Sequence, residues 1–215
     1  MDTRTSAPQD TSLFGLLRHG ETEWNAVKRI QGLSNSQLTA RGIRQTKQWA
    51  QTLGQWEWDQ IYASDLGRVQ ETVAILNESL GLPTHFDTRL REQNWGEWEG
   101  RTIASIKTDF KKELQERVAL GWGFSAPGGE TRTSVLNRAF EVLHYIAGDM
   151  PPKKTLIVCH QGVIKTILYH LKGRQFLPEE EPLIQHNNLH LIDYNQVGFN
   201  INTLNIPRQG EKPRQ

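Results

Sequence analysis

The sequence predicts an α/β fold in which a largely parallel β-sheet is covered by helices on both faces. Short apolar runs alternate along the chain with longer segments whose apolar residues recur at helical spacing, a pattern typical of βαβ units. The chain has 215 residues, enough to bury a substantial core, and its single cysteine cannot form an internal disulfide. With no internal repeat in view, we expect one domain over residues 12–206 and flexible polar tails over 1–11 and 207–215.

Apolar runs in the first half of the chain end where polar residues begin, as buried strands do. The run Leu-Phe-Gly-Leu-Leu stops at Arg18. Thr39 can cap a helix that ends near Gly54, and Gly81 can close the following helix. In chain order we expect a strand over residues 13–18, the helix between Thr39 and Gly54, a strand over 59–63, a helix over 67–80 and a strand over 84–87.

The second half of the chain continues the alternation and closes with two strands. Residues 103–120 are strongly charged but carry apolar residues at helical spacing, so we expect one continuous helix there. The run Thr-Leu-Ile-Val-Cys over 155–159 is typical of a buried strand. The further elements that we expect are helices over residues 134–147 and 162–171 and strands over 189–194 and 199–204.

The charges of the chain nearly cancel, since 25 Lys and Arg residues face 24 Asp and Glu residues. Without a strong overall field we expect no nucleic-acid or membrane partner, and any anion site must be local. No apolar stretch approaches the ~18 residues that span a bilayer, and residues 1–10 lack the apolar segment of a secretory signal. Together with the unpaired Cys159, these features predict a cytoplasmic protein.

The most informative stretch runs from Leu16 to Asn25 and reads Leu-Leu-Arg-His-Gly-Glu-Thr-Glu-Trp-Asn. A predicted strand ends here in Arg18 and His19, and Gly20 then releases the backbone into a turn. In open α/β sheets ligands bind just beyond the carboxyl ends of the strands. Arg18 and His19 are therefore placed where the chemistry of such folds is usually done.

A second strand ends in the same way, because His160 follows the run over 155–159 and precedes a glycine and a helix. Neighbouring parallel strands lie about 4.8 Å apart. If the two strands are neighbours, His19 and His160 converge on one pocket although 141 positions separate them in the sequence. A single histidine at a strand end is more often structural, but two in matching contexts indicate a shared site.

Two further segments supply an arginine and several carboxylates. Arg68 lies in the first turn of a predicted helix, where unpaired backbone N–H groups suit a phosphate. Residues 90–100 place three glutamates among tryptophans and glycines in an irregular stretch. Taken alone, Arg68 is as well explained as a solvated surface residue, and Glu97 and Glu99 as ordinary acids of a surface loop.

These segments resemble, in order and approximate spacing, the histidine phosphatase (phosphoglycerate mutase-like) superfamily over most of residues 13–192. The resemblance implies a three-layer α/β/α sandwich with a doubly wound, mostly parallel sheet and a site at the strand ends. By the same resemblance His19 is the nucleophile, Glu92 the general acid, Arg18, Arg68 and His160 the ligands of the phosphoryl group, and Asn25 and Gln31 residues that line the pocket.

One position departs from the family pattern. Many members have a pair of glycines after the second histidine, whereas this chain has Gln161 followed by Gly162. The backbone N–H of Gln161 can still point at a bound phosphate, and its side-chain amide can help to shape specificity. The departure therefore does not change the expected chemistry.

We expect a metal-independent phosphatase, with no cofactor, that hydrolyses a small phosphomonoester through a phosphohistidine on His19. Two guanidinium groups can meet the negative charge of a phosphoryl group in transfer. The five other histidines show none of the spacings typical of metal ligands, so no metal site is expected.

Two alternatives to hydrolysis remain open. One is a 2,3-bisphosphoglycerate-dependent phosphoglycerate mutase, although such relatives typically carry a longer insertion between Gly100 and Pro127. The other is a domain that binds a phosphorylated ligand without catalysis. The expected partner is a small phosphorylated metabolite, and the sequence indicates neither which one it is nor the oligomeric state.

Overall fold

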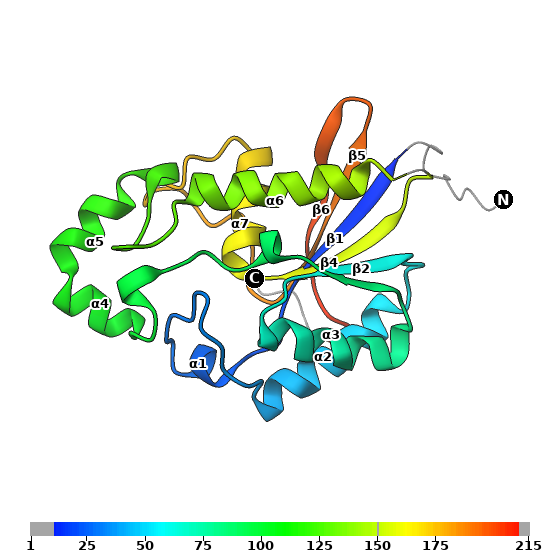
Figure 1. Cartoon of the computed structure of the whole chain (residues 1–215), viewed down its shortest axis with the longest axis horizontal. Coiled ribbons are helices and arrows are strands. Elements are labelled where there is room, and N and C mark those ends of the chain that lie inside the picture. The colour runs from blue at the N-terminus through cyan, green and yellow to red at the C-terminus, as the bar shows by residue number, and fades with distance from the viewer. Residues whose placement is uncertain (1–10, 150, 211–215) are drawn as a thin grey trace.

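Six strands form one mixed sheet in the order β3-β2-β4-β1-β5-β6 (Figure 1). The structure is a computed structural model that describes residues 11–149 and 151–210. The four strands β3, β2, β4 and β1 run parallel, and β5 and β6 complete the sheet through antiparallel pairing. The strands are β1 (Ser12–Arg18), β2 (Gln60–Ala63), β3 (Thr84–Phe86), β4 (Lys154–Cys159), β5 (Leu189–Asn195) and β6 (Gly198–Ile206).

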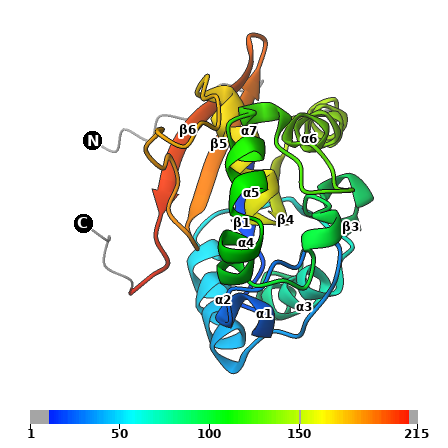
Figure 2. The ribbon, with the colours of Figure 1, turned by 90° about the vertical axis from the view of Figure 1, so that its left-hand side faces the viewer.

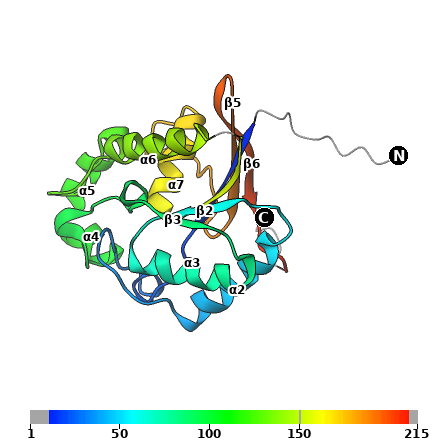
Figure 3. The ribbon, with the colours of Figure 1, turned by 45° about the vertical axis from the view of Figure 1, so that its right-hand side comes forward.

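Helices cover both faces of this sheet, as Figure 3 shows with α6 and α7 on one side and α2 and α3 on the other. The predicted α/β/α sandwich with a doubly wound, mostly parallel sheet is confirmed. The helices are α1 (Glu23–Ala26), α2 (Ala40–Leu53), α3 (Gly67–Leu80), α4 (Ile103–Asp109), α5 (Lys111–Val118), α6 (Arg132–Ala147) and α7 (Gln161–Leu171), with short 3₁₀ turns at Thr88–Leu90, Gly96–Trp98 and Gly121–Gly123.

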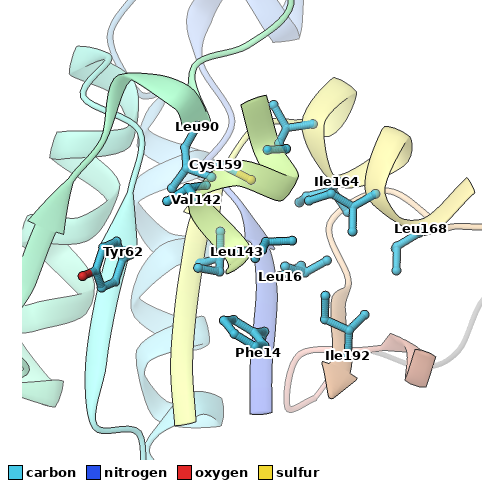
Figure 4. Packing of buried hydrophobic residues seen from close by; sticks show 14 of the residues in the cluster. Phe14, Leu16, Tyr62, Leu90, Val142, Leu143, Cys159, Ile164, Leu168 and Ile192 are labelled. Carbon is cyan, nitrogen blue, oxygen red and sulfur yellow. The ribbon is translucent and has the colours of Figure 1, made fainter. Parts of the chain in front are cut away.

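Successive side chains of the central strands enter two separate cores, which explains their unbroken apolar sequences. Phe14 and Leu16 of β1 pack toward α6 and α7 (Figure 4), whereas Leu17 packs toward α2 and α3. Between them, a Cβ on Gly15 would lie 2.4 Å from the indole ring of Trp58. Only glycine therefore lets this tryptophan lie against the strand.

The expected signals at helix ends act as predicted in two places. The side chain of Thr39 accepts a hydrogen bond from the backbone N–H of Gly42 at 2.9 Å, which satisfies one of the free donors of the first turn of α2. Gly81 ends α3 with a left-handed backbone, φ 61°. Both helices are thus fixed by residues that the sequence singles out.

The prediction of one continuous helix over residues 103–120 is wrong. The helix stops at Phe110, whose backbone (φ −122°, ψ 28°) is not helical, and α5 begins at the next residue. Phe110 and residues of both short helices pack on a small core around Trp98 and Phe124. A straight helix cannot curve around so small a core, so the break lets both halves contact it.

The structure also differs from the expected tail over residues 207–215. Arg208 is only 6 % exposed, and the backbone N–H of Gln209 donates to the hydroxyl of Thr52 in α2 at 3.0 Å. The ordered domain therefore continues past residue 206. Residues 1–10 of the expected N-terminal tail and residues 211–215 of the expected C-terminal tail lie outside the described residues.

The carboxyl ends of β1 and β4 point to the side of the molecule that carries α4 and α5, which lie in front of these strands in Figure 2, with α1 below them. This is the edge at which the sequence analysis expects the site. Among the helices of residues 11–149 and 151–210, none is long and apolar enough to cross a membrane.

Candidate active site

The two histidines that follow β1 and β4 lie side by side. The strands are parallel neighbours with Arg18 opposite Cys159, and the backbone N–H of His19 donates to the carbonyl of Cys159 at 3.0 Å. This register brings the rings of His19 and His160 to a centroid distance of 5.2 Å. The predicted convergence of the two histidines is confirmed.

The ring of His19 is held in one tautomer by its own turn. Its Nδ1 lies 2.8 Å from the carbonyl oxygen of Gly20, and because a carbonyl only accepts, Nδ1 carries the proton. The lone pair of a neutral ring is therefore on Nε2. Burial, and then the charges of Arg18 and Arg68, hold the pKa of His19 well below 6.5. An uncharged imidazole with a free Nε2 is the form that can attack phosphorus.

Arg68, in the first turn of α3, is buried and tightly held. Its side chain is 1 % exposed, with Nη1 donating to the carbonyl of Ser34 at 2.6 Å and Nη2 to the carbonyl of Gly32 at 2.8 Å. Nη2 also lies 3.2 Å from Nδ1 of His160. Burial lowers the pKa of Arg68 to about 10, so the guanidinium stays charged at neutral pH. Its interpretation as a solvated surface residue is excluded.

His160 is neutral and bonded through both ring nitrogens. Because arginine only donates, Nδ1 of His160 accepts from Arg68, which leaves the proton on Nε2 to be donated to the hydroxyl of Ser64 at 2.9 Å. Burial, and then the charge of Arg68, lowers the pKa of His160 well below 6.5. Its predicted contact with the phosphoryl group therefore requires one of these bonds to be exchanged when the anion binds.

Ser64 is a site residue that the sequence analysis missed. It directly follows β2, as His19 follows β1 and His160 follows β4, and these three strands are adjacent in the sheet. Ser64 is fully buried, and its backbone N–H donates to the carbonyl of Val158 at 3.1 Å. The signal that could have found it is the same one, a polar residue at the carboxyl end of a buried strand.

Arg18 has donors that nothing in the described part of the chain accepts. Its side chain makes no hydrogen bond to residues 11–149 or 151–210, and its Nε is buried without a partner, as is the Nε of Arg68. Burial lowers the pKa of Arg18, and Glu92 is the acid that opposes this shift most. An unsatisfied buried donor costs roughly 1–3 kcal/mol, a cost that an anion would offset. Two such donors beside His19 indicate an anion site.

Glu92 lies against the first turn of α7. Its Oε2 accepts from the backbone N–H of Gly162 at 3.2 Å, and its Oε1 accepts from that of Gln93 at 2.9 Å. A Cβ on Gly162 would lie 2.2 Å from Oε1, so this contact requires glycine. Arg138 holds the same segment by donating to the carbonyl of Glu92 at 3.1 Å. The carboxylate is thus fixed beside Gly162, two residues after His160.

The three residues predicted to bind substrate lie in two different settings. Asn25 and Thr22 form a capping box at the start of α1, with N–H to side-chain oxygen distances of 3.3 and 3.2 Å. Gln31 is 6 % exposed; its amide donates to the hydroxyl of Thr22 at 2.7 Å and accepts from Ser36 at 3.1 Å. Both amides thus hold the loop together. Gln161 instead starts α7, directly after His160. Contact of these residues with substrate stays a prediction.

The described residues offer little for other kinds of chemistry. Within 11–149 and 151–210, no group of three or more His, Cys, Asp or Glu side chains could hold a metal ion. Cys159 is fully buried, and burial raises the pKa of its thiol to about 12, so it does not supply a thiolate nucleophile. The candidate chemistry therefore rests on the imidazole of His19, the two arginines and Glu92.

The arrangement defines a class of protein: an α/β sandwich that brings together a neutral imidazole and two guanidinium groups at the carboxyl ends of its strands. The sequence model of the histidine phosphatase superfamily (branch 1) matches residues 14–207. The chain belongs to this family.

Individual relatives are consistent with this assignment. The chain is 35 % identical over 181 residues to a "Probable phosphoglycerate mutase GpmB" of Yersinia pestis (strain Pestoides F), covering 84 % of each protein. It is similar in structure to Bacillus stearothermophilus YhfR, with a TM-score of 0.81, 28 % identity and coverage of 94 % of this chain and 98 % of the other. It is also similar to a mycobacterial glucosyl-3-phosphoglycerate phosphatase in complex with VO3, with a TM-score of 0.78, 29 % identity and coverage of 91 % and 99 %.

Proposed function

We propose that the protein is a phosphatase that hydrolyses a small phosphomonoester through a phosphohistidine on Nε2 of His19. One observation carries the proposal: the buried, neutral ring of His19 has its Nδ1 tied to Gly20, beside two arginines whose Nε donors have no partner in the described chain. The first feature supplies a nucleophile of defined tautomer. The second supplies donors for the oxygens of the group that it attacks.

The reaction runs in two balanced steps. In the first, Nε2 of His19 bonds to phosphorus, the bond from phosphorus to the ester oxygen breaks, and protonated Glu92 gives its proton to the leaving alkoxide. In the second, a water attacks phosphorus, Glu92 takes a proton from that water, and the P–N bond breaks to release phosphate. Arg18 and Arg68 oppose the negative charge of the equatorial oxygens in both steps, and no step of this scheme uses a metal.

The phosphoglycerate mutase activity is the alternative, supported by the name of the relative at 35 % identity. A mutase must keep water from the phosphohistidine until the group returns to substrate. Residues 103–118 of this chain form only two short helices, α4 and α5, whereas the family resemblance implies a longer insertion in mutases. This difference favours hydrolysis. Rapid formation of 2-phosphoglycerate from 3-phosphoglycerate with the bisphosphate primer would instead establish the mutase.

The experiment that tests the proposal uses aryl phosphates with good and poor leaving groups. Wild-type protein should hydrolyse p-nitrophenyl phosphate in the presence of EDTA and be inhibited by vanadate. His19→Ala should abolish turnover and the labelled phosphoenzyme while the protein stays folded. Glu92→Gln should slow poor leaving groups by about 10²–10⁴ and good ones much less. Absence of turnover in folded wild-type protein would favour the non-catalytic alternative, and equal slowing of all esters would remove Glu92 from the acid role.

A further inference from the structure

The guanidinium of Arg68 is oriented by two carbonyl groups of one loop. Gly32 and Ser34 supply these carbonyls, at 2.8 and 2.6 Å, from a segment 34 or more residues away in the sequence. A carbonyl can direct a guanidinium only if its own peptide plane is fixed. The position of Arg68 therefore depends on whatever holds residues 32–34.

The carboxylate of Glu99 holds this loop. Its Oε1 accepts from the backbone N–H of Leu33 at 2.8 Å, and its Oε2 accepts from the N–H and the hydroxyl of Ser34 at 3.3 and 3.1 Å. The N–H of Leu33 and the carbonyl of Gly32 belong to the same peptide group. One peptide plane is thus bonded to Glu99 on one side and to Arg68 on the other. Bonding at both ends fixes the plane and polarises it in the sense that strengthens its bond to Arg68.

The local sequence is built to admit this carboxylate. Gly32 has a left-handed backbone, φ 52°, and a Cβ on it would lie 1.9 Å from Oε1 of Glu99. Any other residue at position 32 would push the carboxylate away. Oε1 of Glu99 also accepts from the backbone N–H of Trp95 at 3.2 Å, in the segment that carries Glu92. Glu99 therefore links the loop that holds Arg68 to the segment that bears the predicted general acid.

We propose that Glu99 is a positioning residue for phosphoryl transfer: through the peptide group between Gly32 and Leu33 it sets the orientation of Arg68, and it does not itself touch the substrate. This inference rests on the proposed function, in which Arg68 binds the transferring group. Glu99 is half-buried, and from the sequence alone it is explained as an ordinary acid of a surface loop. Its four hydrogen bonds exclude that interpretation.

The test compares Glu99→Gln with Glu97→Gln. The first variant keeps the shape of the side chain but turns an NH₂ group toward backbone N–H donors, and the second changes an exposed acid of the same segment. For each variant we would measure kcat and KM for p-nitrophenyl phosphate, the inhibition constant of vanadate, and Tm. Glu99→Gln should lower kcat/KM and weaken vanadate inhibition by about 10–100-fold, since displacements near 1 Å have such effects. Glu97→Gln should match wild type.

The outcomes of these measurements decide whether Glu99 positions Arg68. Wild-type values for Glu99→Gln, or losses that only follow a lower fraction of folded protein, would overturn the proposal. Gly32→Ala offers a second route, because it should displace the same carboxylate and its effect should not add to that of Glu99→Gln. Should wild-type protein lack turnover, the proposed function fails, and the binding of inorganic phosphate by calorimetry still tests the positioning role: a Kd unchanged in Glu99→Gln would refute it.

Discussion

Replacing Gly162 by alanine should separate catalysis from folding. The added Cβ would lie 2.2 Å from Oε1 and 3.1 Å from Cδ of Glu92, whereas ordinary contacts begin at 3.4 Å. The carboxylate is the end of a flexible side chain, so it can move aside by roughly 1 Å, a displacement that can cost about 10²-fold in rate. Alanine is favoured over glycine within a helix by up to about 1 kcal/mol, so the fold should not be weakened.

The assay follows kcat/KM for phenyl phosphate and for p-nitrophenyl phosphate, together with Tm. Because Glu92 is predicted to protonate the leaving alkoxide, Gly162→Ala should slow the phenyl ester by about 10²-fold and the nitrophenyl ester much less. The matched control is Gly54→Ala, at the end of α2, where a Cβ meets its nearest atom at 3.4 Å. Wild-type hydrolysis of phenyl phosphate by Gly162→Ala, or equal loss on both esters with a lower Tm, would refute the reasoning.

Two further predictions concern stability. His190 is 2 % exposed and accepts from the N–H of Asn205, and burial lowers its pKa from 6.5 to about 4. As the pH drops from 6.5 to 4, the histidine is protonated in the unfolded chain before it is protonated in the folded one, so the free energy of unfolding should fall by about 3 kcal/mol for this group. In urea titrations the stability of His190→Gln should therefore depend less on pH than that of wild type. An unchanged pH dependence would contradict the argument. Gly15→Ala places a Cβ 2.4 Å from the ring of Trp58 and should lower the free energy of unfolding by about 1–3 kcal/mol. A urea midpoint equal to that of wild type would mean that the Trp58 side chain moves aside without cost.

The types and order of the principal strands and helices could be predicted from residue patterns alone, and so could two of the residues that meet in the site. Strands buried on both faces and amphipathic helices have characteristic local patterns of apolar residues, so they can be predicted without a structure. His19 and His160 could be paired because parallel neighbouring strands bring their carboxyl ends to one edge. For the same reason Ser64, at the end of β2, was within reach of that argument.

The break at Phe110, the burial of Arg68 and the hydrogen bonds of Glu99 can be seen in the folded molecule alone. Each depends on contacts between segments far apart in the chain: a small core around Trp98, or loop carbonyls that face a guanidinium from 34 residues or more away. The orientation of a peptide plane cannot be predicted from residue type, because every residue other than proline carries the same backbone N–H and carbonyl groups. Periodicity therefore predicted where the site lies, and long-range hydrogen bonds determined which residues hold it in shape.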